Sequence, residues 1–107
     1  GQRMAVAKDE KEISEAALAL YLCNLKAEAS QAWAEAWRCK QIENLRSDSY
    51  ESIRQIALAD SIRLSIGDIN INDAIRTSLE SKNALNDLVN ARADTKNALL
   101  ALKLYAG

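Results

Sequence analysis

The most informative absences in this chain of 107 residues are those of proline, histidine and phenylalanine, none of which occurs. Glycine occurs three times, and only Gly67 lies away from the ends. So few turn-forming residues do not suit the many tight turns of a β-sandwich or a barrel. Without histidine, the commonest general base and zinc ligand, catalytic triads and most zinc sites are excluded. The composition therefore predicts an all-α protein that is not an enzyme and needs no cofactor and no metal.

An excess of charge of one sign is also lacking. The 14 lysines and arginines are nearly balanced by 15 aspartates and glutamates. The two halves of the chain are each close to balance as well. A basic face for nucleic acid or for an anionic lipid surface is therefore not expected.

Cysteine and long apolar runs are scarce too. Cys23 and Cys39 lie on one predicted helix, about 24 Å apart at helical rise, which is too far for a disulfide. We expect both to be small buried apolar residues. The longest apolar run, from Ala16 to Cys23, is far shorter than a membrane span, and the first residues do not resemble a signal peptide. We expect residues 1–107 to form a single α-helical domain that is soluble and is a fragment of a larger protein.

Helical periodicity extends over residues 6–66. An apolar row with the three- and four-residue steps of a coiled coil is made by Leu22, Leu25, Ala29, Ala32, Ala36 and Cys39. The row then shifts through Ile42 and Leu45 and resumes at Ile53, Ile56 and Ala57. Asp48 and Glu51 at the shift would suit a capping box, so a break near Ser47 would give three helices. Because no proline or glycine lies there, a continuous helix is favoured.

A turn is predicted at residues 67–70, with a second helix over about 71–105. Gly67 suits the left-handed residue that closes a helix, and Asn70 suits the N-cap of the next one, with Asp73 at its third position. One row of mostly small residues then follows heptad spacing: Thr77, Ser81, Ala84, Leu88, Ala91, Thr95, Ala98, Leu102 and Tyr105. A second apolar row lies on a neighbouring face: Ile75, Leu79, Leu85, Val89 and Leu99.

Two apolar rows on one helix predict two neighbours. The first helix would be about 90 Å long and the second only about 50 Å. A hairpin around Gly67 would leave about 40 Å of the first helix, with Trp33 and Trp37, without a partner in the chain. We therefore expect a long antiparallel hairpin that belongs to a layer or bundle, and an isolated chain that self-associates.

From residue 50 onward the sequence resembles the outer membrane efflux proteins, or TolC family. The resemblance rests on the turn sequence of residues 66–75, on small residues such as Ala84 and Ala91 at heptad spacing, and on the closing residues 104–107. It implies the periplasmic helical hairpin from the C-terminal half of a trimeric channel. The hairpin would pack laterally through Ser81, Ala84, Leu88, Ala91, Ala98 and Leu102.

The resemblance also implies a site at the turn. Gly67, Asp68, Asn70 and Asp73 would lie at the periplasmic tip and contact the adaptor of a pump in the inner membrane. The same residues also suit plain turn and capping chemistry. The family pattern is not kept at Ile69 and Arg76, so an acidic ring built on both the Asp73 and Arg76 positions is not expected. The alternative function is a free-standing helical-hairpin interaction protein, either a secreted dimer or an adaptor.

Overall fold

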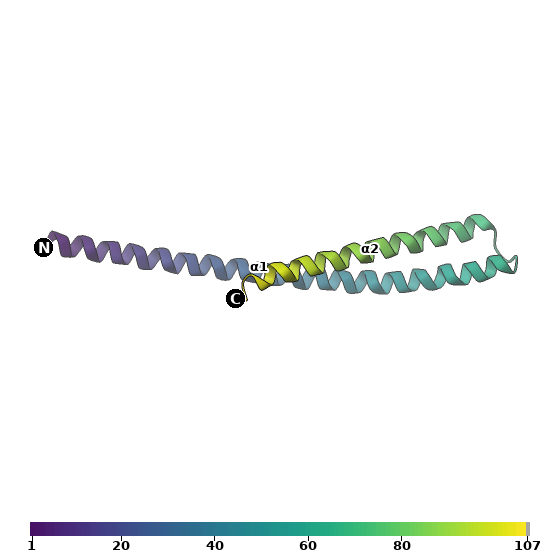
Figure 1. Ribbon diagram of the computed structural model, residues 1–107, viewed down its shortest axis with the longest axis horizontal. Helices are drawn as coiled ribbons and strands as arrows, with labels where there is room; N and C mark the ends of the chain where they lie inside the picture. Colours follow the sequence, from purple (N-terminus) through teal and green to yellow (C-terminus); the bar gives the residue numbers. More distant parts are fainter. Residues whose placement is uncertain (107) are drawn as a thin grey trace.

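The computed structural model describes residues 1–106, which form two antiparallel helices joined by a tight turn (Figure 1). Helix α1 comprises Gln2–Ser65 and helix α2 comprises Ile71–Lys103. The molecule is a thin rod with extents of 98 × 20 × 14 Å. The all-α hairpin predicted from the periodicity is confirmed.

Helix α1 is continuous over 64 residues and passes through Ser47 without a break. The three-helix alternative is therefore wrong. Glu51 does not serve as a capping residue, because its carboxylate accepts two hydrogen bonds from Arg54, at 2.7 and 3.1 Å. With no proline or glycine between Gln2 and Ser65, nothing in this part of the chain interrupts the hydrogen bonds of the helix.

The core is the single seam where the two helices meet. On α2 the buried residues are those of the predicted small-residue row, namely Thr77, Ala84, Leu88, Ala91 and Thr95. On α1 only Ala36 and Cys39 are buried. Leu88, at 2% exposed, is the largest side chain that is fully enclosed. Small side chains let the two helices approach closely, but they bury little apolar surface.

The phase of the α1 seam differs from the sequence prediction. Leu45 and Ile56, which were predicted on the seam, are 68% and 55% exposed. The seam instead continues through Glu43, Ser47, Tyr50, Ile53 and Ala57, all of which are half-buried. The polar residues Glu43 and Ser47 at seam positions gave the apolar pattern the appearance of a shift. The Glu43 side chain is only 15% exposed and pairs with Lys40 at 2.8 Å.

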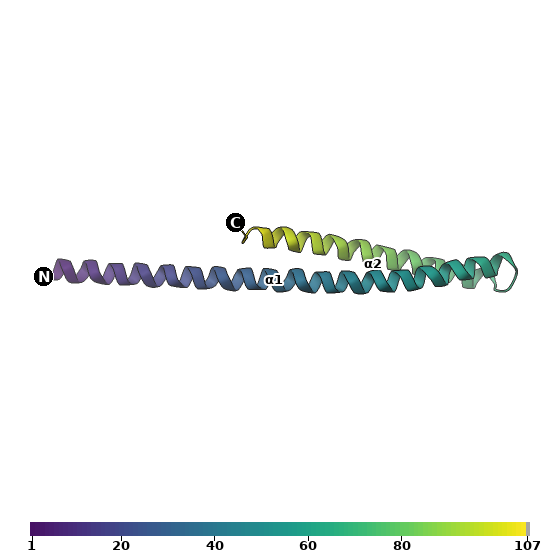
Figure 2. The ribbon, with the colours of Figure 1, turned by 90° about the horizontal axis from the view of Figure 1, so that it is seen from below.

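Helix α2 is about half as long as α1, so the N-terminal part of α1 extends beyond it (Figures 1 and 2). The end of α2 lies beside Trp33, which lines a surface hollow with Ala29, Leu102 and Tyr105. The unpaired part is therefore the N-terminal segment up to about residue 28, which we call the overhang. The prediction that Trp33 and Trp37 lie on the unpaired part is wrong, because both lie level with α2. Their side chains point outward from the pair, 61% and 57% exposed.

Candidate interaction surfaces

The hairpin turn is built by backbone chemistry around Gly67. Its φ of +77° is the one positive φ among the described residues, in a region that only glycine adopts readily. The Gly67 N–H donates to the Leu64 carbonyl at 3.1 Å, and the Asp68 N–H donates to the Arg63 carbonyl at 2.8 Å. This pair of bonds is the Schellman motif, which satisfies carbonyls left open at a helix end.

Arg63 supports the turn with its side chain. Its Nε donates to the Asp68 carboxylate at 3.0 Å, and its Nη1 lies 3.6 Å from the Asp60 carboxylate. Arg63 and Asp68 are the two positions where a Schellman motif often has an apolar contact, and here an ion pair takes that place. The sequence analysis did not identify Arg63. The five-residue spacing from Arg63 to Asp68 across the glycine was the signal that could have found it.

Helix α2 begins with a side-chain cap. The Asn70 amide oxygen accepts a hydrogen bond from the Asp73 N–H at 3.0 Å, as the sequence predicts for an N-cap. The Asp73 carboxylate lies in the first turn, where it favours the positive end of the helix dipole, and it lies 3.6 Å from Arg76. The four predicted tip residues thus lie together at the closed end of the hairpin. The side chains of Asp68, Asn70 and Asp73 all have partners within the chain.

The six predicted packing residues face α1. Ala84, Leu88 and Ala91 are buried, and Ser81, Ala98 and Leu102 are half-buried. The second apolar row has no such cover. Ile75, Leu79, Val89 and Leu99 are 47–54% exposed, and Leu85 is 38% exposed. One of the two rows on α2 is therefore paired within the chain, and the other faces outward.

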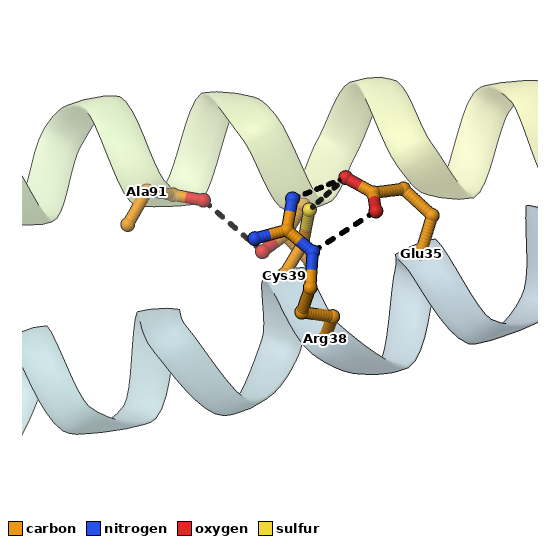
Figure 3. Close-up of polar contacts among 5 residues, drawn as sticks. Glu35, Arg38, Cys39 and Ala91 are labelled. Atoms are coloured by element: carbon orange, nitrogen blue, oxygen red, sulfur yellow. Dashed lines mark hydrogen bonds and ion pairs between the residues drawn. The ribbon is translucent and has the colours of Figure 1, made fainter.

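The two cysteines have different surroundings. Cys39 is buried against α2 near Ala91, and its thiol donates to Glu35 at 3.5 Å (Figure 3). Arg38 donates to both oxygens of the same carboxylate, at 2.6 and 3.0 Å. These hydrogen bonds, led by that of Arg38, lower the pKa of Glu35 from its ordinary value of 4.5. Burial, followed by the contact with Glu35, raises the pKa of Cys39 from 9.0. Cys23 lies on the overhang and is exposed, so the prediction that it is buried is wrong.

The remaining surface has shallow hollows along the hairpin. The one of about 590 Å³ near the open end is lined by apolar residues such as Leu99 and Leu102, and its charged lining residues are Lys40, Glu43, Arg92, Lys96 and Lys103. Within residues 1–106, no group of three or more acidic or cysteine side chains is placed to hold a metal ion. In the same part of the chain, neither helix has a stretch apolar enough to cross a membrane.

Comparison with known proteins identified no relative of this chain. The chain matches no protein-family model, no curated protein and no solved structure. The resemblance to outer membrane efflux proteins thus stays a prediction from the residues around the turn.

Proposed function

We propose that this chain is a wall element of a larger helical assembly: the periplasmic hairpin of an outer membrane efflux or export channel, belonging to the TolC family. The observation that supports this best is the second apolar row of α2. A helix with one row paired inside its hairpin and another exposed suits an assembly in which every helix has two neighbours. A hairpin that functions alone would leave this row in water.

The closed end of the hairpin suits a docking role. The Schellman turn, the Arg63 ion pairs and the Asn70 cap together hold a short, rigid tip about Gly67. In the proposed assembly this tip points away from the outer membrane and meets a periplasmic adaptor, which connects to a pump in the inner membrane. The hairpin performs no chemistry. It acts through helix packing along its length and through contacts at its tip, in a trimeric parent channel.

The reading frame that encodes the chain gives the first test. A second helical hairpin and amphipathic β-strand segments in the same frame are the expected result. A start codon at Met4 with a stop codon directly after Gly107 would contradict the proposal. That result would favour the alternative, a free-standing hairpin that binds a partner as a secreted dimer or an adaptor.

Photo-crosslinking in the native cell tests the docking role. A photoreactive residue at Asp68, at the tip, should crosslink the parent protein to a periplasmic adaptor. The matched control is Gln55, which is exposed on α1 about 18 Å before Gly67 at helical rise. Equal crosslinking to the adaptor from both positions, or none from Asp68, would contradict docking at the tip.

A further inference from the structure

The hairpin carries a cluster of cations on one side of its open end. Two adjoining hollows there, of about 590 and 370 Å³, are lined by five of them: Lys26 and Lys40 of α1, with Arg92, Lys96 and Lys103 of α2. Both hollows include Leu102 and Ala106, so they form one continuous surface, which we call the basic patch. The near balance of charge along the sequence conceals this patch, so the expectation that no basic face exists is wrong.

The charge of the basic patch is largely uncompensated. Among its described lining residues the one acid is Glu43, which pairs with Lys40 at 2.8 Å and has a side chain only 15% exposed. Within residues 1–106, the other four cations belong to none of the ion pairs, and these are Lys26, Arg92, Lys96 and Lys103. Toward the tip the same side of α1 is mixed in charge, with Asp48 and Glu51 directly after seam residues. The excess of positive charge is therefore confined to the open end.

Apolar side chains lie between these cations. Leu99 and Leu100 line the larger hollow and are 47% and 51% exposed. Trp33 lines the smaller hollow and is 61% exposed. Trp37 lies one helical turn further along the same side of α1 and is 57% exposed. An occupant that fits the basic patch therefore combines apolar side chains with negative charge.

A second copy of this chain offers no such surface. The side of the hairpin opposite the basic patch is mixed in charge, because arginines lie among its acids and pair with them: Arg38 with Glu35, Arg46 with Asp87, and Arg76 with Asp73. The overhang is mixed as well, since Lys8 and Lys11 lie among its acids. Either surface of a second copy would bring cations against the cations of the patch, which opposes binding. The occupant therefore has a different sequence.

The spacing of the cations suits a helix as the occupant. On α2, Lys96 follows Arg92 by four residues and precedes Lys103 by seven. On α1, Lys26 and Lys40 are two heptads apart, about 21 Å at helical rise. Charges that repeat at such intervals beside a seam are those that select the neighbouring helix in coiled coils. A helix that lies along the basic patch, with carboxylates at the same intervals, would meet all of them.

We propose that the basic patch is covered by an acidic helix from another part of the parent protein. The carboxylates of that helix lie against Lys26, Arg92, Lys96 and Lys103, and its apolar side chains lie against Leu99 and Trp33. Apolar contact supplies most of the attraction, and the charges decide which helix is accepted and in which register. This inference rests on the proposed function, because it gives a chemistry to one of the two neighbours that a wall element needs.

Photo-crosslinking of the full-length parent protein in the native cell identifies the occupant. A photoreactive residue at Leu99 leaves every cation of the basic patch in place. It should capture a helix from another segment of the parent polypeptide, and mass spectrometry identifies the captured peptide. That peptide should have a net negative charge, with carboxylates at helical spacing. The matched control is Asn97, which is exposed and points about 200° away around α2.

Charge reversal then tests the role of the cations. Arg92→Glu with Lys96→Glu should lower the capture from Leu99 at least roughly fivefold. Replacement of the captured helix's carboxylates by lysine in the same protein should restore it, because the pairing is then inverted. Lys8→Glu with Lys11→Glu reverses two charges on the overhang and should leave the capture unchanged. Circular dichroism of the isolated chain with each pair of substitutions confirms that its helices are intact.

Several outcomes would overturn the proposal. Capture of the same hairpin from another copy, capture of lipid, or no capture from Leu99 above that from Asn97 would each assign the patch to something else. A captured helix without net negative charge, or capture that charge reversal leaves unchanged, would overturn it as well. A parent channel whose captured helix is not acidic contradicts this inference alone. An acidic helix captured within a parent protein that is not a channel contradicts the proposed function alone.

Discussion

At the scale of single residues, the hairpin depends most on Gly67. A Cβ atom at this position would meet nothing within 4 Å, so there is room for a side chain. The constraint is the backbone, because a φ of +77° is strained for every residue with a Cβ except, to a lesser degree, asparagine and aspartate. The role of Gly67 is therefore conformational, whatever contacts the tip.

Substitution at Gly67 should separate this strain from side-chain chemistry. Gly67→Ala should lower the free energy of unfolding by about 1 to 2 kcal/mol, the cost of a left-handed residue with a Cβ. Gly67→Asn should cost less, because asparagine tolerates this conformation. Urea titration monitored by helical circular dichroism measures both. Equal stability of the alanine variant and the wild type would show that the turn is free to change its conformation.

The two thiols should react at different rates. Cys39 is buried and burial raises its pKa, so both its accessibility and its thiolate fraction at pH 8 are reduced, whereas Cys23 is exposed. Iodoacetamide should therefore alkylate Cys23 roughly ten times faster than Cys39, or more. Peptide mass spectrometry over time measures the two rates. In a chain unfolded by urea the difference should disappear, and its persistence there would contradict a structural cause.

At the scale of the elements, each helix depends on a single row of contacts. The row of alanines, threonines and Leu88 on α2 brings the two helices together. Leu88 is the one large side chain of this row that is fully buried. Isolated helices gain little stability from propensity alone, so the seam holds the hairpin. Truncation of one large seam residue should therefore lower the free energy of unfolding more than truncation of any exposed residue.

Leu88 and its neighbour Val89 offer a matched comparison. Leu88→Ala should cost about 2 to 3 kcal/mol, the lower part of the range for buried leucine, because this thin seam can relax. Val89→Ala should cost less than about 0.5 kcal/mol in the monomer, since Val89 is half exposed. Thermal unfolding at low protein concentration measures both. A larger loss from Val89→Ala at high concentration would indicate that the exposed row is covered by another copy.

The elements also show what the sequence could predict. Heptad spacing, a lone internal glycine and an N-cap asparagine are local signals, and they located both helices, the turn and the α2 seam. The α1 seam was harder to predict, because Glu43 and Ser47 occupy positions where a pattern search expects apolar residues. The Arg63–Asp68 pair spans the turn at Gly67, so it depends on how the chain folds back there. Helical periodicity does not reveal it.

At the scale of the whole molecule, stability is unevenly distributed. The part of α1 that pairs with α2 has a seam, whereas the overhang has no partner within the described chain (Figure 2). Among its apolar side chains, Met4, Ile13 and Leu18 are 58–78% exposed. A helix in this position keeps only its internal hydrogen bonds and its propensity.

Hydrogen exchange should show this division along the chain. Amides of the overhang should exchange close to the unprotected rate, while those from about Ala36 to Ile53 and from Ala84 to Thr95 should be the slowest. Mass spectrometry of peptides from dilute protein measures the rates. Uniform protection along α1 in a chain shown to be monomeric would contradict this prediction. Protection of the overhang only at high concentration would point to a partner helix from another copy.

The rod shape has a consequence for how the mass of the protein is measured. The radius of gyration is 26.9 Å, about twice the value of about 13 Å expected for a compact domain of 100 residues. Such a rod has high hydrodynamic friction, so a monomer leaves a sizing column early, where a globular protein of much larger mass would emerge. Elution volume would therefore report an oligomer even for a single chain. Only methods that do not depend on friction, such as static light scattering or sedimentation equilibrium, can count its copies.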